Sequence, residues 1–402
     1  MLRFLTAGES HGKALVTIIE GVPAGLAIDI DALTSDLRRR QTGYGRGRRM
    51  LIESDRAEPL SGIRHGVTTG GPIALLIPNK DWENWQRTMY SESEMPANAP
   101  GADRAAVTRP RPGHADLAGF VKYGHQDMRN VLERASARET AARVAVGAIA
   151  RQLLQSVGAE IVSHVVRIGQ AAVADPLALT FEQVRAIAAD APLHCADQAV
   201  EQQMIAEIDK AREAGDTMGG TFEVIVHGLP PGLGSYVHWD RKLDGRLAQA
   251  LMSIPAIKAV GIGRGPAVAE VPGSRVHDEI LPGPDPSGEA SIPLARPTNN
   301  AGGLEGGVTN GQDLRETAYM KPISTLMKPL RSVDLTTMTV SPAAIERSDV
   351  CAVPAAAVVG EAMVAFVLAD AVIEKFGADS IDELVTNWKN FRDRTAARFA
   401  PR

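Results

Sequence analysis

The sequence predicts an α+β fold built from α and β layers, and its length allows two to three domains or one large domain. Short apolar runs bounded by turn residues recur along the chain, as expected for strands. Alanine-rich stretches with helical spacing begin near residue 136 and again near residue 354. Polar loops rich in glycine lie between these segments, and such loops are where a functional site is expected.

Composition limits the class of protein before any motif is considered. The chain has 402 residues, 44% of them hydrophobic, and a formal net charge of −5. A dedicated nucleic-acid binder is usually basic, so an anion site here must be a local concentration of arginine. The two cysteines, Cys195 and Cys351, lack metal-site spacing and are too few for a disulfide framework. We therefore expect a soluble, cytoplasmic protein with no metal site.

The first half of the chain begins with strands. An apolar strand precedes Ser10, and residues 14–22, 25–30 and 72–78 are predicted to form further strands. Asp31 is predicted to cap a helix that carries Leu33 and Leu37 and ends near Gly43. Residues 79–112 have little periodicity and predict a long loop or a lid.

The next segment carries the clearest helix signal. Ser136 and Glu139 have the spacing of a capping box, and the helix that follows is predicted to stop at Gly158. Residues 161–168 predict a strand, and residues 198–214 predict a surface helix.

The remainder repeats this alternation. Residues 221–226 predict a strand and residues 240–252 a helix, whereas residues 261–313 have little periodicity. Pro354 is predicted at the first position of a helix ending near Gly377. Glu361 and Asp370 interrupt its apolar run, which favours a buried helix over a membrane span.

Arginines concentrate in one glycine-rich stretch, RRRQTGYGRGRR at 38–49, which contains no acidic residue. Six guanidinium groups repel one another unless an anion or solvent intervenes, and arginine pairs well with carboxylate and phosphate. The alternative is a solvated basic loop or an RNA-contacting patch. A second cluster, Arg104, Arg109 and Arg111, precedes His114, where flanking prolines stiffen the chain.

Other segments are candidates for binding or acid–base chemistry. Ser10 and His11 follow a strand at a turn, but neighbouring residues alone do not make a nucleophile pair. Arg134 to Ser136 open the long helix, whose amino end favours anions as well as capping. The glycines of 302–311 suit a flat ligand close to the backbone, and Lys321 to Thr325 add a cation and hydroxyls. Asp349 beside Arg347 is either an ion pair or a functional carboxylate.

Seven blocks in order resemble the chorismate synthase family over nearly the whole chain. They are GESHGKALVTIIEG at 8–21, RRRQTGYGRGRRM at 38–50, TRPRPGHADLAG at 108–119, RASARETAARVAVGAIAR at 134–151, GGLEGGVTNGQ at 302–312, MKPISTL at 320–326 and RSDVCAVPAA at 347–356. The resemblance implies a lyase that converts 5-enolpyruvylshikimate 3-phosphate to chorismate by 1,4-elimination of phosphate, the last step of the shikimate pathway. It implies reduced FMN as cofactor, with NADPH as a reductant that some members use.

The resemblance also implies a fold and an assembly. The family fold is a β-α-β sandwich with pseudo-symmetric halves, here placed at roughly 1–215 and 216–402, and the assembly is a homotetramer.

The same resemblance assigns roles to residues. His11 would protonate the departing phosphate with Ser10 beside it, His114 would manage the flavin's charge, and Asp349 would help remove the ring proton. Substrate or nicotinamide-nucleotide binding falls to Arg40, Arg46, Arg48, Arg111, Arg134 and Arg347. Cofactor binding falls to Arg134, Ala135, Ser136, Pro255, Ala256, Gly307, Lys321, Pro322, Ile323, Ser324, Thr325 and Arg347.

Two other functions compete with a lyase. A nucleic-acid-binding module would use the 38–49 loop, but the acidic net charge and 4% aromatic content argue against it. A phosphate-ester hydrolase would need a metal cluster or a G-x-S-x-G nucleophile elbow, and the sequence suggests neither. We therefore expect a small-molecule substrate, with no nucleic-acid or membrane partner.

Overall fold

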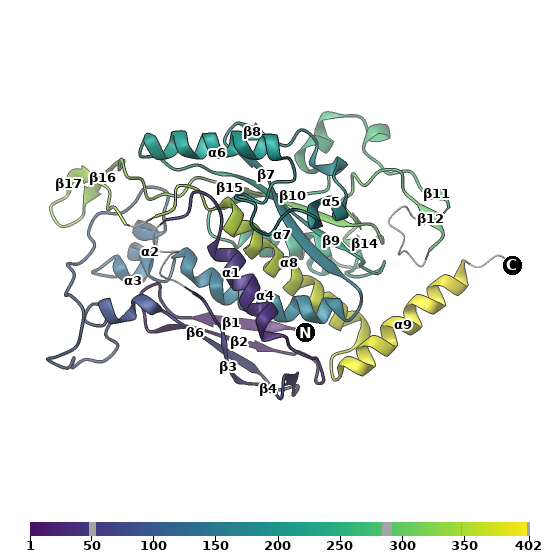
Figure 1. The fold of residues 1–402 in the computed structure, drawn as a ribbon, viewed down its shortest axis with the longest axis horizontal. Coiled ribbons are helices and arrows are strands. Elements are labelled where there is room, and N and C mark those ends of the chain that lie inside the picture. Colours follow the sequence, from purple (N-terminus) through teal and green to yellow (C-terminus); the bar gives the residue numbers. More distant parts are fainter. Residues whose placement is uncertain (48–53, 284–291, 347, 400–402) are drawn as a thin grey trace.

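The structure is a computed structural model that describes residues 1–47, 54–283, 292–346 and 348–399. It is a β-α-β sandwich, in which helices α1, α4 and α8 lie between two antiparallel sheets (Figure 1). This arrangement confirms the predicted α+β class. Mixed sheets and helices pack in this way because each sheet must bury one apolar face against another layer.

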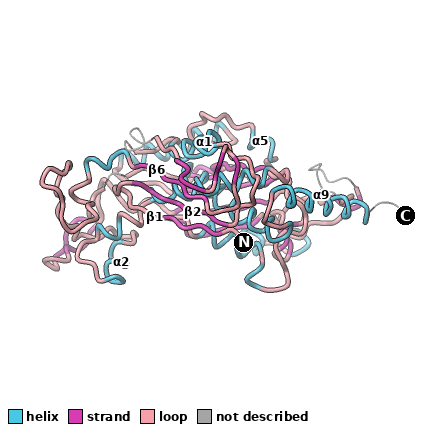
Figure 2. Tube along the Cα trace, turned by 90° about the horizontal axis from the view of Figure 1, so that it is seen from below, coloured by secondary structure: helices cyan, strands magenta, loops and turns pink. Residues whose placement is uncertain are grey.

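The first sheet has four strands in the order β1-β2-β6-β3. Their bounds are Arg3–Ala7, Ala14–Glu20, Ile73–Pro78 and Glu58–Ser61. In β2 and β6, Leu15, Ile19, Ile73 and Ile77 alternate with more exposed residues, so one face packs on the helices. The opposite face is turned towards the viewer in Figure 2, where β1, β2 and β6 lie at the front.

The second sheet has five strands in the order β10-β15-β9-β7-β8. Their bounds are Ile257–Ile262, Leu314–Met320, Gly220–His227, Glu160–Ile168 and Ala171–Ala172. Four two-stranded ribbons complete the strands of the described residues: β4 (Ile63–Arg64) with β5 (Val67–Thr68), β11 (Leu281–Pro282) with β12 (Leu294–Ala295), β13 (Leu304–Glu305) with β14 (Val308–Thr309), and β16 (Arg331–Asp334) with β17 (Thr339–Pro342).

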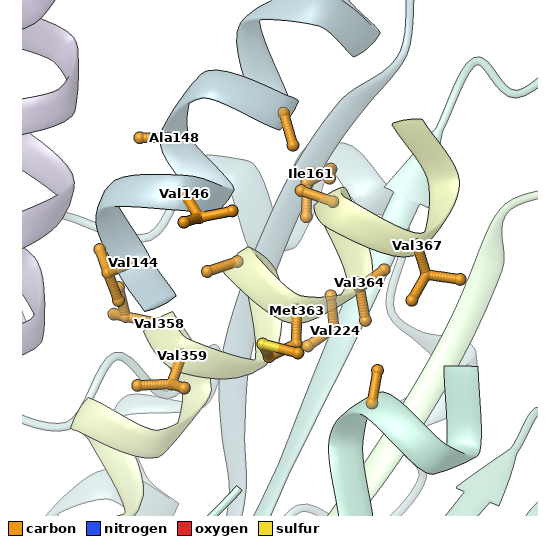
Figure 3. Close-up of a cluster of buried hydrophobic side chains, with 14 of the residues drawn as sticks. Val144, Val146, Ala148, Ile161, Val224, Val358, Val359, Met363, Val364 and Val367 are labelled. Carbon is orange, nitrogen blue, oxygen red and sulfur yellow. The ribbon is translucent and has the colours of Figure 1, made fainter. Parts of the chain in front are cut away.

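The middle layer holds α1 (Ile30–Gln41), α4 (Thr140–Gln155), α7 (Leu243–Met252) and α8 (Val353–Phe376). Helix α8 contacts α1, α4 and α7 as well as strands β7 and β9, and is buried on all sides. Figure 3 shows Val358 of α8 beside Val144 of α4, and Met363 of α8 beside Val224 of β9. A Cβ at Gly147 would lie 2.3 Å from the Cα of Ala362, so α4 and α8 approach too closely for any side chain there.

Other helices lie at the edges of the sandwich. They are α2 (Asp116–Tyr123), α3 (Arg129–Leu132), α5 (Phe181–Arg185), α6 (Gln198–Glu213) and α9 (Ile381–Arg398). Single 3-10 turns span Lys80–Asn84, Ala137–Glu139, Pro176–Ala178, Trp239–Arg241, Gly265–Glu270 and Gly273–Arg275. Helix α9 extends away from the sandwich towards the C-terminus (Figure 1), and Leu384 is its one buried residue.

Helix α8 is long and apolar enough to cross a membrane, but 89% of its most apolar window is buried inside the protein. The two acidic residues that interrupt it are both paired. Glu361 accepts hydrogen bonds from Arg39 at 2.7 and 2.8 Å and from Ser163 at 2.6 Å. Burial opposes its charge, yet Arg39 and Arg151 hold the pKa of Glu361 well below its usual range. The carboxylate of Asp370 accepts a hydrogen bond from Arg246 at 2.7 Å.

Most predicted elements are present, with their ends shifted, but several details were wrong. Residues 25–30 do not form a strand, because the chain there makes only isolated bridges before α1 begins at Ile30. The cap of α1 is Asp29, whose carboxylate accepts from the amides of Asp31 and Ala32 at 2.8 and 3.0 Å. Pro354 is the second residue of α8, not the first.

The predicted capping box is also replaced by a different arrangement. The hydroxyl of Ser136 accepts from the amide of Arg138 at 3.2 Å, because a 3-10 turn precedes α4. The Glu139 carboxylate accepts from Thr6 at 2.7 Å and from Arg143 at 2.9 Å. Glu139 therefore links α4 to β1 instead of capping its own helix.

Candidate active site

The turn between β1 and β2 places Ser10 and His11 against Glu133, which ends α3. The backbone amide of Ser10 donates to the carbonyl of Glu133 at 3.0 Å. The amide of His11 donates to Glu133 Oε2 at 2.9 Å, and the imidazole Nδ1 lies 2.9 Å from Oε1. Burial would raise the pKa of Glu133, but its contacts with His11 hold that pKa below the usual range. A carboxylate against Nδ1 orients the ring and directs Nε2 away from Glu133.

Ser136 joins the same group from the start of α4. Its hydroxyl lies 3.2 Å from the hydroxyl of Ser10. Its neighbour Arg134 donates to the carbonyls of Thr6 and Gly8 at 2.9 and 3.3 Å. The Arg134 guanidinium thus binds the backbone at the end of β1, next to the turn that carries Ser10 and His11.

A second cluster forms around Asp116, the fully buried first residue of α2. Its carboxylate accepts from Arg111 at 2.8 and 3.0 Å and lies 2.6 Å from Nδ1 of His114. Burial opposes ionisation, but His114 and Arg111 hold the pKa of Asp116 well below its usual value. Arg111 also donates to the hydroxyl of Thr325 at 3.0 Å, which joins two distant segments of the chain.

A third cluster holds two buried guanidinium groups around Asp55. Arg40, from the last turn of α1, and Arg138 both donate to Asp55 Oδ2, at 3.0 and 2.6 Å. Asn79 accepts from Arg138 at 2.9 Å and donates to the carbonyls of Glu9 and Gly12 at 3.1 and 2.7 Å. Asn79 therefore ties this cluster to the Ser10–His11 turn.

The loop after α1 meets the segment before α8. Arg46 forms an ion pair with Asp349 at 2.7 Å, and the amide of Gly47 donates to the other carboxylate oxygen of Asp349 at 2.6 Å. Arg48 and Arg347, which the sequence also assigns to binding, lie outside the described residues. Asp349 is therefore paired with a partner from the arginine-rich loop, which the sequence did not indicate.

The segments assigned to cofactor binding come together only in part. The amide of Lys321 donates to the carbonyl of Ala256 at 3.0 Å, and the Lys321 ammonium donates to the carbonyl of Gly113. Pro255–Ala256, Lys321–Thr325 and the His114 loop are thus neighbours. Gly307 instead turns the β13–β14 hairpin and accepts from the amide of Leu243 at 2.9 Å. In the described hydrogen bonds, Gly307 is not joined to the segments around Lys321.

Hydrogen bonds through residues 217–218 connect the Thr325 segment to the Arg46–Asp349 pair. The hydroxyl of Thr217 donates to the carbonyl of Ile323 at 2.7 Å, and the amide of Met218 donates to the carbonyl of Val350 at 2.8 Å. The amide of Val350 then donates to the carbonyl of Gly45 at 2.8 Å. The segments that carry Thr325, Asp349 and Arg46 are therefore linked one to the next through residues 217–218.

Two surface cavities lie elsewhere, with volumes of about 450 and 400 Å³. The first is lined by residues that include Asp244, His277 and Glu305, and the second by residues that include Arg56 and Lys80. None of the predicted site residues lines either one. The convergence of titratable groups is a stronger indication of a site than concavity, because it requires specific charges from distant segments.

The described residues contain no group of three or more metal-binding side chains. Several residues of the site escaped the sequence analysis, among them Trp85, Arg129, Glu133, Asp55, Asn79 and Arg138. Arg138 lies inside the recognised block 134–151 and Glu133 directly precedes it, and that position was the available signal. Asp55, Asn79 and Trp85 carried none, since their partners lie far away in the sequence.

Known proteins resemble this chain over its whole length. The profile of the chorismate synthase family matches residues 2–373. The chorismate synthase of Carboxydothermus hydrogenoformans is 55% identical over 97% of this chain and 98% of that protein. The chorismate synthase of Desulforudis audaxviator is 56% identical over 100% of both chains. A crystal structure of chorismate synthase superposes with a TM-score of 0.78 at 41% identity, covering 98% of each chain. The chain belongs to the chorismate synthase family.

Proposed function

We propose that this chain converts 5-enolpyruvylshikimate 3-phosphate into chorismate and phosphate, the last step of the shikimate pathway. The observation that carries the proposal is that distant segments meet in charged clusters: His11 with Glu133, Arg111 with Asp116 and Thr325, and Arg46 with Asp349. A substrate with two carboxylates and a phosphate needs several cations, and arginine provides them in a form that pairs with planar anions. Family membership supports the same reaction.

His11 is proposed to give a proton to the departing phosphate, with Ser10 beside it. Glu133 holds Nδ1 of the imidazole at 2.9 Å, so the proton for the phosphate is carried at Nε2. Without protonation the leaving group would depart with an additional negative charge, which the nearby arginines would have to neutralise.

Asp349 is proposed to take part in removing the ring proton. Arg46 and the amide of Gly47 fix its carboxylate from two sides, which supports a set position for the acceptor. The hydrogen removed is not adjacent to a carbonyl, so an ordinary base would face a large barrier. Asp349 would act next to a bound reduced FMN, whose chemistry would supply the electron density that this step requires.

The residues present fit an anionic flavin. Lys321 brings an ammonium beside Gly113, while Ser324 and Ser136 bring hydroxyls, a donor set suited to phosphate and to the polar edge of a ring. Ala256 has a φ of 70°, a strained conformation for a residue with a side chain. His114, held by Asp116 at 2.6 Å, is proposed to manage charge at the pyrimidine end of the flavin. NADPH is the proposed reductant, bound near Arg40, Arg46, Arg48 and Arg111.

We further propose a cytoplasmic homotetramer. On the outer face of the first sheet, Leu5 is 69% and Ile18 43% exposed, and the two residues pair with each other across β1 and β2. An exposed apolar sheet face supports contact with a second copy of the chain. The two pseudo-symmetric halves, roughly 1–215 and 216–402, remain part of this proposal. Strand β7 of the first half pairs with β9 of the second, so the halves share one sheet.

An anaerobic assay with dithionite-reduced FMN and 5-enolpyruvylshikimate 3-phosphate tests the reaction. We expect chorismate absorbance and one phosphate per chorismate. Repeating the assay with NADPH in place of dithionite tests whether the chain reduces its own flavin. Absence of product from protein that binds FMN tightly would reject the lyase function.

A further inference from the structure

Trp85 lies flat against His11. The two ring centroids are 3.8 Å apart, and the planes differ by 17°. The guanidinium carbon of Arg104 lies 3.9 Å from the Trp85 ring centroid. Two groups this close to one ring overlap unless they occupy opposite faces, so the indole is sandwiched between His11 and Arg104.

Several contacts fix the indole in this position. Trp85 is 6% exposed, and its Nε1 donates to Asp81 Oδ2 at 3.0 Å. The guanidinium of Arg129 lies 5.3 Å from the same ring and 3.5 Å from Glu133. Nε and Nη1 of Arg129 are buried and lack a hydrogen-bond acceptor among the described residues, as expected for a cation whose neighbour is an aromatic ring.

The rest of this segment is tied to itself. Arg87 pairs with Asp103 at 3.0 Å, and the hydroxyl of Thr88 donates to the carbonyl of Ala102 at 2.8 Å. These contacts close residues 87–103 into a loop. Trp85 lies just before this loop in the sequence, and Arg104 directly follows it. We call residues 80–104 the strap. Trp85 and Arg104, at the base of the closed loop, are therefore the strap residues that lie at the proposed catalytic histidine.

We propose that Trp85, backed by Arg104, positions the His11 imidazole for proton transfer to the substrate. Glu133 holds one edge of the imidazole, but a hydrogen bond at Nδ1 still tolerates small rotations about the Cα–Cβ and Cβ–Cγ bonds that tilt the ring. A ring stacked at 3.8 Å removes these rotations and fixes the direction of Nε2. Trp85 is thus a positioning residue, and the inference rests on the proposed role of His11.

The competing explanation is that Trp85 merely anchors the strap in the core. In that case Trp85→Ala would loosen the strap and leave the geometry of His11 unchanged. Trp82 offers a matched control, because it belongs to the same strap and its backbone carbonyl accepts from the amide of Trp85 at 2.9 Å. A merely anchoring role would make the two tryptophans equivalent.

The test compares Trp85→Ala, Trp85→Phe and Trp82→Ala in the full-length protein, using kcat, KM and the His11 resonance. Protein labelled with carbon-13 at histidine Cε1 gives one signal for each of the nine histidines, and the His11 signal is the one absent in His11→Asn. We expect Trp85→Ala to lower kcat by about tenfold to a hundredfold, the usual cost of a misplaced group, with KM changed much less. Its His11 signal should move as the ring current is lost, and Trp85→Phe should restore both properties.

An unchanged His11 signal in Trp85→Ala would overturn the proposal, as would equal losses of kcat in Trp85→Ala and Trp82→Ala. Full activity of His11→Asn would overturn the acid role of His11 itself. That result is distinguishable, because the signal shift in Trp85→Ala would then occur without any change in kcat.

Discussion

Arg40 and Arg138 meet at a single carboxylate oxygen, Oδ2 of Asp55, at 3.0 and 2.6 Å. The two guanidinium groups come from α1 and from the turn before α4, nearly a hundred positions apart in the sequence. Burial, with a smaller contribution from the charge of Arg138, lowers the pKa of Arg40 to about 10 despite the opposing charge of Asp55. One carboxylate therefore holds together two cations at the edge of the proposed site.

Replacing Asp55 by Asn should destabilise the protein by about 3–5 kcal/mol, because both buried cations lose their counter-charge. Hydrogen bonds and charge from Arg138 and Arg40 outweigh burial and keep the folded pKa of Asp55 below its unfolded value. Its stabilisation is thus complete above the unfolded pKa of about 3.9 and is lost as the pH falls through the folded pKa. Urea unfolding at pH 7 measures the effect. Asp31→Asn, at an exposed position, should change stability little.

Glu133→Gln should lower turnover by about 10²–10⁴, the share usually supplied by a positioned acid–base group. The Gln amide can still form a hydrogen bond with the imidazole. Because it carries no negative charge, it stabilises a proton on Nδ1 less than a carboxylate does. Steady-state kinetics under anaerobic conditions gives the measurement. Asp240→Asn is the matched control, since Asp240 contacts the exposed His238 at 2.8 Å. Wild-type turnover in Glu133→Gln would contradict the orienting role.

Asp349→Asn should slow the proton step while leaving FMN affinity within about threefold, a change below 1 kcal/mol in binding. The amide keeps the size of the side chain but cannot accept a proton at pH 7. Rapid-mixing kinetics reports the step, and flavin fluorescence reports the affinity. Full activity would reject Asp349 as the base, whereas loss of FMN binding would indicate a structural role in the Arg46 loop.

Glu316 in β15 is fully buried, and neither carboxylate oxygen has a hydrogen-bond partner among the described residues. Burial, with a smaller contribution from Asp244, raises the pKa of Glu316 well above its usual value. The folded state therefore loses stability as the pH rises from the unfolded pKa of about 4.3 towards the folded pKa. Glu316→Gln should remove this loss, giving higher stability at pH 8 and little change at pH 4. The exposed Glu58→Gln should show neither effect, and equal unfolding curves for Glu316→Gln and wild type at pH 8 would refute the prediction.

Leu5→Lys should weaken the proposed assembly, because it puts a charge on the apolar sheet face between copies. Leu5 is 69% exposed, so the fold of one chain should tolerate the change. Light scattering after size exclusion measures the mass. Val121→Lys, 70% exposed on α2, is the control for adding a charge at an exposed apolar position. An unchanged mass for Leu5→Lys would show that this face is not an interface.

The sequence predicted the regular elements best where a local signal was strong. Helix α8 was recognisable because its apolar run is long and its interruptions few, and α6 because Gly215 follows it. Strand β15 and helix α9 were missed. Strand β15 reads RETAY in its interior, where Arg315 and Glu316 point to opposite faces and are both buried. Arg315 is stabilised by hydrogen bonds to Glu223 and to backbone carbonyls near Leu177. These partners lie far away in the sequence, so no local pattern could predict them.

By itself, the sequence determined which chemistry the chain can carry: arginines in two short blocks, histidines at stiff turns and the ordered family motifs. Tertiary structure alone decided which of these groups meet. Glu133 reaches His11 across 122 positions, and Arg111 reaches Thr325 across 214. Hydrogen bonds and ion pairs act over a few ångströms, whereas local sequence patterns extend over one or two turns. Partners such as Asp55 and Trp85 therefore become visible only once the sandwich has brought the loops between its layers together.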